Sequence, residues 1–337
     1  MLRSLSVLTL ATTLAAQVQT TAYVQESTLG NQGNAGPLGC SATGLFAEAR
    51  SQILIPARYL PGPGAVLLGL EALGTSGAGT NTTLTYASLR IAVSRTSATT
   101  LGSSFASNLP LPEVLLSTSN LTVHWQANAF TPITFATNYV HDGQSNLVID
   151  IQKVVSPIGD ATMKTIQNAR RTDLPRMINA LGTAGSNAHV ANTATVTNNA
   201  PLTLALRWAG VGGAFTPTLK LKSDPSASFR AQFEIGRPVD ATVQGTPGAV
   251  FIPFLGTTLF PTPVLMPGVA GGLWISDPLV LGAGILPAGG ASTLNLTIPN
   301  DPALVNLYLA FQSVVAPLPI TQLQLTNAAD FIVTNGL

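Results

Sequence analysis

The sequence is poor in charged residues. Of 337 residues, 9% are Asp, Glu, Lys or Arg, with 15 basic and 14 acidic side chains. A nucleic-acid surface needs clustered Lys and Arg to neutralise phosphates. The only short basic cluster is Arg170, Arg171 and Arg176. This scarcity of charge argues against nucleic acid as a partner.

Cysteine and histidine are equally scarce. Cys40 is the only cysteine, so no disulfide within the chain is possible, and we expect a buried or loop thiol. His124, His141 and His189 lack the short spacings of a zinc site. Residues 141–146 (HDGQSN) suit a hairpin turn. A Ca²⁺ loop is the alternative, although the residues do not follow the EF-hand pattern. We therefore predict no metal and no cofactor.

The chain also lacks the signatures of an enzyme active site. No Gly-x-Ser-x-Gly segment marks a nucleophile, and the few Glu residues form no local pair of the kind that glycosidases use. The Gly-rich run 210–214 opens no helix, so it is interpreted as a linker and not as a phosphate-binding loop. We predict no catalytic residues, although acids distant in sequence could still meet in space.

No apolar run is long enough to form a membrane-spanning helix. The run 264–286 is broken by Pro and Gly, and Leu5–Ala16 is too short to span a bilayer. Because Leu5–Ala16 follows a basic start at Arg3 and ends in two alanines, residues 1–16 are predicted to be a signal peptide. The protein is then expected to be secreted or displayed at the cell surface.

The pattern that is present predicts β-strands. Thr is abundant, Lys and Glu are rare, and apolar residues alternate with polar ones in short runs between turn signals. We predict an all-β fold of two antiparallel β-sandwich domains, jelly-roll or Ig-like, at 22–210 and 216–337. An irregular crossover with at most short helices is expected near 160–182. The clearest predicted strands are 88–95, 121–125, 146–154, 203–208, 219–222, 229–235, 250–255, 272–275, 292–298, 306–312 and 322–327.

Several of these segments resemble exported bacterial two-domain β-sandwich proteins. The C-terminal match runs through 292–304 (STLNLTIPNDPAL), 307–312 (LYLAFQ) and 325–328 (LTNA). The N-terminal match is 88–96 (SLRIAVSRT), 99–108 (TTLGSSFASN) and 146–151 (NLVIDI). These motifs are turns and core positions. The resemblance therefore implies export and a sandwich fold, and it assigns no catalytic residue.

Two functions fit this sequence. The first is a non-catalytic structural or interaction protein of the cell surface or extracellular space, able to self-associate or to bind cell-surface polysaccharide or another surface protein. The alternative is a carbohydrate-binding module, which would stack sugars on exposed aromatic rings. Trp125 and Tyr139 are the candidate rings, with His124 beside them, whereas Trp208 and Trp274 are predicted to be buried. The stretch 241–337 contains no Lys or Arg, so we expect its apolar strands to be covered by the first domain or by a partner.

Overall fold

The structure is a computed structural model that describes 20–23, 33–34, 37–76 except 42 and 45, 81–126, 129–156, 163–166, 177–198, 204–210, 216–223 and 233–335. Strands dominate the described residues, which contain no α-helix and only single turns of 3-10 helix: η1 (Ala57–Tyr59), η2 (Ala188–Val190) and η4 (Pro302–Leu304). The all-β prediction is confirmed. None of the described segments is a helix long and apolar enough to cross a bilayer.

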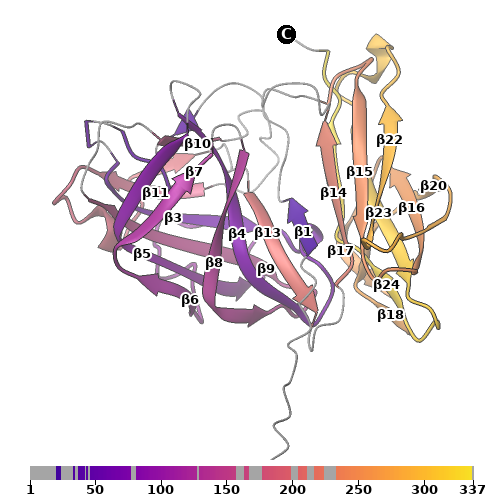
Figure 1. The fold of residues 1–337 in the computed structure, drawn as a ribbon, viewed down its shortest axis with the longest axis horizontal. Coiled ribbons are helices and arrows are strands. Elements are labelled where there is room, and N and C mark those ends of the chain that lie inside the picture. Colours follow the sequence, from indigo (N-terminus) through magenta and orange to yellow (C-terminus); the bar gives the residue numbers. More distant parts are fainter. Residues whose placement is uncertain are drawn as a thin grey trace, which may run out of the picture.

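Strands up to residue 210 form two sheets, here called the N-terminal sheets, which lie on the left of Figure 1. The first has the order β1-β13-β4-β10-β2, with β8 also on β4. The second has the order β12-β11-β3-β9-β5-β6, with β7 also on β5. Their bounds are β1 (Thr20–Tyr23), β2 (Gly33–Asn34), β3 (Glu48–Ile55), β4 (Ala65–Ser76), β5 (Thr82–Thr96), β6 (Glu113–Thr118), β7 (Leu121–Trp125), β8 (Ala129–Val140), β9 (Asn146–Val155), β10 (Met163–Ile166), β11 (Met177–Gly182), β12 (Val196–Asn198) and β13 (Leu204–Gly210).

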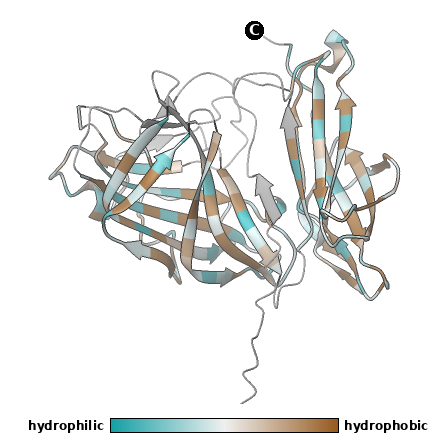
Figure 2. Ribbon diagram, in the orientation of Figure 1, coloured by the Kyte–Doolittle hydropathy of each residue, from teal (hydrophilic) through white to brown (hydrophobic). Residues whose placement is uncertain are grey.

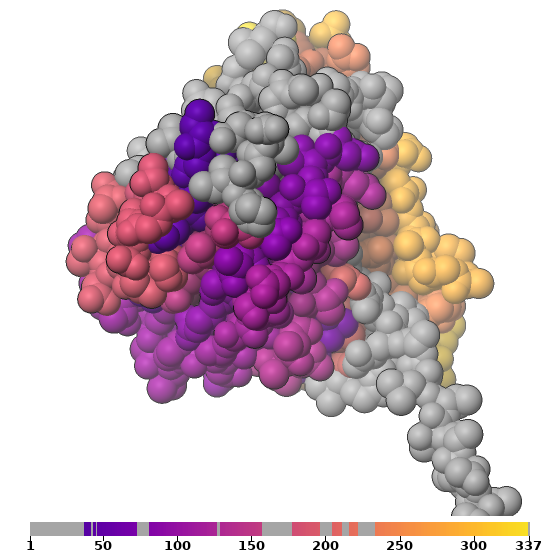
Figure 3. Space-filling model, turned by 60° about the vertical axis from the view of Figure 1, so that its left-hand side comes forward, coloured from indigo at the N-terminus to yellow at the C-terminus, as the bar shows by residue number. Residues whose placement is uncertain are grey.

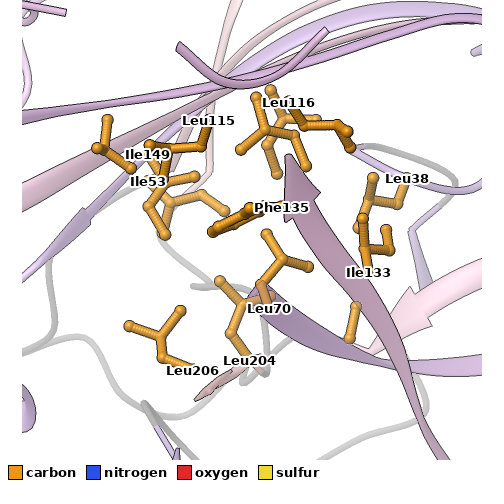
Figure 4. Packing of buried hydrophobic residues seen from close by; sticks show 14 of the residues in the cluster. Leu38, Ile53, Leu70, Leu115, Leu116, Ile133, Phe135, Ile149, Leu204 and Leu206 are labelled. Carbon is orange, nitrogen blue, oxygen red and sulfur yellow. The ribbon is translucent and has the colours of Figure 1, made fainter. Parts of the chain in front are cut away.

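Alternation in the sequence places one face of each strand in a shared core. In β5, Leu89, Ile91 and Val93 are fully buried, whereas the intervening Arg90 points outward. Side chains of both N-terminal sheets meet in one apolar cluster, where Phe135 lies among leucines and isoleucines (Figure 4). The packing is sandwich-like, because two sheets bury their inner faces against each other.

Strands from residue 218 onward form the C-terminal sheets, on the right of Figure 1. One has the order β14-β15-β22, a larger one has β18-β24-β23-β16-β20 with β21 on β16 and β25 on β23, and β17 pairs with β19. Their bounds are β14 (Thr218–Ser223), β15 (Pro238–Gln244), β16 (Val250–Gly256), β17 (Leu259–Leu265), β18 (Val269–Ala270), β19 (Gly272–Ile275), β20 (Leu279–Val280), β21 (Gly284–Ile285), β22 (Ala291–Thr297), β23 (Tyr308–Ala316), β24 (Leu323–Leu325) and β25 (Ala329–Ile332). All described pairings between these strands are antiparallel except β18 with β24, and the isolated bridge between Glu234 and Thr334 is also parallel.

The larger C-terminal sheet has apolar packing on both faces. On one face, Phe251 and Phe311 join a cluster with Val239 and Leu219 of the β14-β15-β22 sheet. Within that cluster the Phe233 and Phe331 rings stack with centroids 4.0 Å apart. On the other face, Phe254 and other residues pack against the β17–β19 hairpin. This accounts for the continuous apolar character of β16, which has no solvent-facing side to alternate with.

Two local predictions need correction. The crossover near 160–182 contains strands β10 and β11 among its described residues, and no helix there. Phe233–Ile235, in the predicted strand 229–235, forms only an isolated bridge, and the rest of that prediction lies outside the described residues. The proposed boundary at 210–215 and the signal peptide also fall largely outside them.

Most of the large apolar side chains that the structure exposes belong to the C-terminal sheets. They lie on β20 and β21 at one edge of the larger sheet, around β24 at the other edge, and at the end of β17. Brown segments on these strands mark the same hydrophobic character in Figure 2. The residues are Val264, Leu265, Leu279, Val280, Ile285, Leu318, Ile320 and Leu323.

Candidate functional site

The three residues predicted to bind a ligand do not form a site. Trp125 and Tyr139 are 2% and 1% exposed, on the inner faces of β7 and β8. His124 is exposed on the opposite face of β7, where its Nδ1 lies 2.9 Å from the Thr83 hydroxyl. The expectation that Trp125 and Tyr139 are exposed is therefore corrected: alternation turns both rings into the core. Trp208 and Trp274 are buried, as predicted.

Polar side chains instead converge where the N-terminal and C-terminal sheets meet. Residues 56–64, here called the junction segment, follow β3 and include η1. Asp330 of β25 accepts hydrogen bonds from the Tyr59 hydroxyl, at 2.6 Å, and from the Tyr308 hydroxyl. The Arg58 Nε lies 3.5 Å from Asp330 Oδ2. A buried carboxylate of one group of sheets is thus neutralised by an arginine of the other.

The charges of this cluster support one another. Burial would lower the pKa of Arg58, but Tyr59 and Asp330 outweigh that effect and raise it, so the guanidinium stays charged. Burial, Asp330 and the hydrogen bond to Asp330 raise the pKa of Tyr308, so its hydroxyl keeps the proton that it donates. The arrangement is an ion pair completed by two tyrosine hydroxyls.

Apolar and backbone contacts reinforce the same junction. Ala57 packs with Trp274 and Ala328 in a small buried cluster. The Ala328 N–H donates to the Arg58 carbonyl at 2.7 Å. A Cβ on Gly62 would lie 3.1 Å from the Gly271 Cα, so the two backbones approach closely there. The prediction that 241–337 would be covered is therefore met in part by the junction segment, whereas its sheet edges remain exposed.

The junction segment is held to the N-terminal sheets by residues 141–146, here called the clamp turn. The Gly64 N–H donates to the His141 carbonyl at 2.9 Å, and the His141 N–H donates to the Ala65 carbonyl at 2.8 Å. The Asn146 Oδ1 accepts from the Ala57 N–H at 2.8 Å. Gly143, at φ +80°, packs so closely on Pro63 that a Cβ would lie 2.4 Å from its nitrogen. A turn is present here, but it is not the predicted hairpin, because β8 pairs with β4 in one N-terminal sheet and β9 pairs with β3 and β5 in the other.

Asp142 stabilises this turn from within. Its carboxylate accepts from the Gln144 and Ser145 N–H groups and from the Ser145 hydroxyl, at 2.6–2.9 Å. These bonds outweigh the effect of burial and lower the pKa of Asp142 to about 2. Its oxygens serve an Asx-type turn, and the described residues contain no group of three or more His, Cys, Asp or Glu able to hold a metal ion.

A second polar network lies on the outer face of β3, β5 and β9. Asp150 is fully buried, 3.0 Å from the Arg50 Nε and 3.6 Å from the Arg90 Nη1, and it accepts a hydrogen bond from Gln52 Nε2 at 3.0 Å. Gln52 also donates to the Phe105 carbonyl, and Arg50 donates to the Ala191 carbonyl. The network ties two loops onto the sheet, so we interpret it as structural.

One lysine points into the N-terminal core. Lys153 is fully buried, and its ammonium donates to the Gly39 carbonyl beside Cys40. Burial lowers the pKa of Lys153 to about 7, although the nearby Cys40 opposes this change. Burial also raises the pKa of the Cys40 thiol. Such a thiol is a weak nucleophile, and the expectation of a buried thiol at Cys40 is confirmed.

Sequence reasoning identified the clamp turn but missed the junction. Tyr59 and Asp330 are 271 positions apart, and Arg58 and Tyr59 lie in no alternating run. The one available signal was Asp330 itself, an isolated charge between apolar residues in a stretch without Lys or Arg. A buried charge of this kind requires a partner from elsewhere.

Comparisons with known proteins place the chain in no family. No model of a known family matches it, and no curated protein does. Two structures of a GH2 β-galacturonidase from Eisenbergiella tayi, bound to galacturonate and to glycerol, are similar at 8% identity and a TM-score of 0.22. The alignments cover 93% and 94% of this chain and 43% of the enzyme. The chain therefore spans less than half the length of that enzyme.

Proposed function

We propose that this protein is an exported, non-catalytic structural or interaction protein of the cell surface or extracellular space, built from two tandem β-sandwich domains. The observation that carries the proposal is the exposed apolar surface of the C-terminal sheets. Leu279 and Ile285 are 64% and 66% exposed on adjoining edge strands, and Ile320 is 63% exposed near the other edge. Edges without lysine gatekeepers favour association.

The polar chemistry of the chain is consistent with this role. Asp142 and Asp301 accept hydrogen bonds from turn amides, and Asp150 and Asp330 are buried in ion pairs. Asp277 accepts from the Thr257 and Thr258 N–H groups. These carboxylates hold the fold together, and an acid committed in this way is a poor general acid or base.

Self-association of the mature chain tests the proposal. Sedimentation velocity at neutral pH is expected to show concentration-dependent association, weakened at least tenfold by Leu279→Lys combined with Ile285→Lys. The matched control is Leu111→Lys combined with Val190→Lys, which places the same charges on exposed apolar positions in the loop before β6 and in η2. Equal weakening by both pairs, or a wild-type monomer at every concentration, would contradict the proposal.

Export has a separate test. Cleavage of residues 1–16 predicts that the protein recovered outside the cell begins at Gln17. A chain that keeps Met1 and stays inside the cell would refute export.

The alternative, a carbohydrate-binding module, is tested separately. Burial of Trp125 and Tyr139 removes the stacking platforms on which it relied. We therefore expect the mature chain to pass unretained over immobilised polysaccharides. Specific retention that a free oligosaccharide competes away would favour the alternative instead.

A further inference from the structure

The clamp turn begins with a histidine whose environment differs from that of the other two. His141 is 1% exposed, and neither of its ring nitrogens has a hydrogen-bond partner. His124 is exposed beside the Thr83 hydroxyl, and His189 lies 3.0 Å from the Glu48 carboxylate. Both of those rings have a neighbour or solvent that accepts a proton from an imidazolium. His141 lacks such an acceptor in the closed conformation.

The groups that face His141 cannot stabilise its charged form well. The ring packs against Trp208 of β13, with centroids 6.0 Å apart, and Tyr139 precedes it on β8. Asp142 lies 3.8 Å from the His141 Nδ1, beyond hydrogen-bond distance. Arg95 of β5, itself 3.8 Å from Asp142, adds an opposing positive charge. The adjoining residues 60–64 (LPGPG) contribute no titratable side chain.

These groups set the proton affinity of the ring. Burial lowers the pKa of His141 to about 4, Asp142 partly opposes the shift, and Arg95 adds to it. The carboxylate of Asp142, whose pKa is about 2, keeps its charge across this range. Glu113 acts on the neighbouring Tyr139. The group that changes charge at the turn between neutral pH and pH 4 is therefore the imidazole of His141.

The position of His141 couples this proton to the junction. Its carbonyl and N–H form the two backbone bonds to Gly64 and Ala65. The next residues of the turn press on Pro63 and bind Ala57. The junction segment in turn carries Arg58 and Tyr59 to Asp330. A displacement of the His141 ring therefore disturbs the backbone that holds the C-terminal sheets.

We propose that the clamp turn is an acid-sensitive latch between the N-terminal and C-terminal sheets. Protonation of His141 expels the ring from its place against Trp208 toward solvent and Asp142. The turn then releases the junction segment, and the C-terminal sheets separate from the N-terminal ones. This conformational switch is additional to the proposed interaction role, and it does not depend on which partner the exposed edges bind.

The direction of the pH dependence follows from the lowered pKa. Because the folded value is below the unfolded one, the contribution of His141 is complete above about pH 6.5, the ordinary histidine value. It is lost as the pH falls toward 4. The latch is therefore closed at neutral pH and open in acid.

Three measurements on the mature full-length chain test the latch. NMR titration is expected to give His141 a proton affinity about 300-fold below that of an ordinary histidine. As His141 titrates, the hydrogen-exchange protection of the Gly64 amide should fall at least tenfold. The radius of gyration from small-angle scattering should rise with the same midpoint.

Two variants separate the latch from general acid unfolding. His141→Phe keeps an aromatic ring and loses no hydrogen bond, since the ring nitrogens make none; it should stay closed to pH 4. His124→Phe, the matched control, should open like the wild type. If His141→Phe opens at the wild-type midpoint, the proposal is overturned. If that variant does not fold, the wild-type titration decides: a Gly64 amide that stays protected after His141 is protonated overturns the proposal equally.

Discussion

The buried Lys153 lowers the stability of the folded protein at neutral pH. Its folded pKa of about 7 lies below the ordinary value of 10.5, so between these values the unfolded chain binds more protons and stability rises with pH. The contribution of the neutral amine is complete above 10.5 and is lost as the pH falls toward 7.

We expect Lys153→Met to stabilise the protein by about 2 kcal/mol at pH 7, because it removes the cost of burying a charge but leaves the Gly39 carbonyl without its donor. The free energy of unfolding of the wild type should rise by about 3 kcal/mol between pH 7 and 9.5, and most of this rise should be absent from the variant. Chemical denaturation at several pH values measures both effects. Parallel pH profiles for the two proteins would show that Lys153 is not the cause.

Gly143 is required for two separable reasons, its positive φ and its close packing on Pro63. Gly143→Ala should therefore cost about 3 kcal/mol, of which roughly 1 kcal/mol is backbone strain. Gly185→Ala is the matched control, because Gly185 has φ +81° and no atom lies within 4 Å of the place that an added methyl group would take. Thermal unfolding of both variants separates the two effects. Equal losses would mean that contact with Pro63 is unimportant.

Among the elements, strand β25 carries the ion pair that joins the two groups of sheets. Asp330→Asn should destabilise the chain by about 3 kcal/mol, because it leaves the Arg58 guanidinium buried without its counter-charge. Asp240→Asn, at an exposed carboxylate that accepts from Asn295, should cost less than about 1 kcal/mol. Denaturant unfolding gives both values.

A compensating change makes the same prediction sharper. Adding Arg58→Met to Asp330→Asn removes the unpaired charge and should recover at least half of the loss. A double variant no more stable than Asp330→Asn alone would show that Arg58 contributes mainly through its packing on the Tyr59 ring.

The sequence predicted best those strands in which apolar residues recur at every second position. β5, β7 and β9 were recognised by this pattern on their core-facing side, although Val148 and Asp150 on the other side of β9 are buried too. β3 (EARSQILI) and β4 were missed. Neighbouring segments cover both faces of β3, and Gly69 interrupts the alternation of β4. For β3, the polar Ser51 and Gln52 are buried as deeply as Ile53, and no local pattern distinguishes such a strand from a loop.

For the whole molecule, the class of fold was predictable and the meeting of its parts was not. Composition and alternation report how one segment meets solvent, and so they sufficed for an all-β prediction. The junction depends on which residue of β25 faces η1, a fact of three-dimensional placement. The view in Figure 3 shows the C-terminal residues behind the N-terminal sheets. The expected exposure of Trp125 and Tyr139 was wrong for a related reason. A ring in an alternating strand faces the core or solvent according to the register of that strand alone.

From β15 onward, the C-terminal sheets also contain no residue after which trypsin-like proteases cut. Trypsin-like enzymes cut after Lys or Arg, and the last such residue is Arg237. Pro238 follows Arg237 and blocks cleavage there, so trypsin-like enzymes find no bond that they can cut within residues 231–337, whether folded or not. Amine-reactive reagents likewise find no lysine on the edges of the larger C-terminal sheet. The strands from β15 onward therefore resist trypsin-like enzymes through composition as well as stability, and they are best mapped with chymotrypsin-like enzymes or carboxylate chemistry.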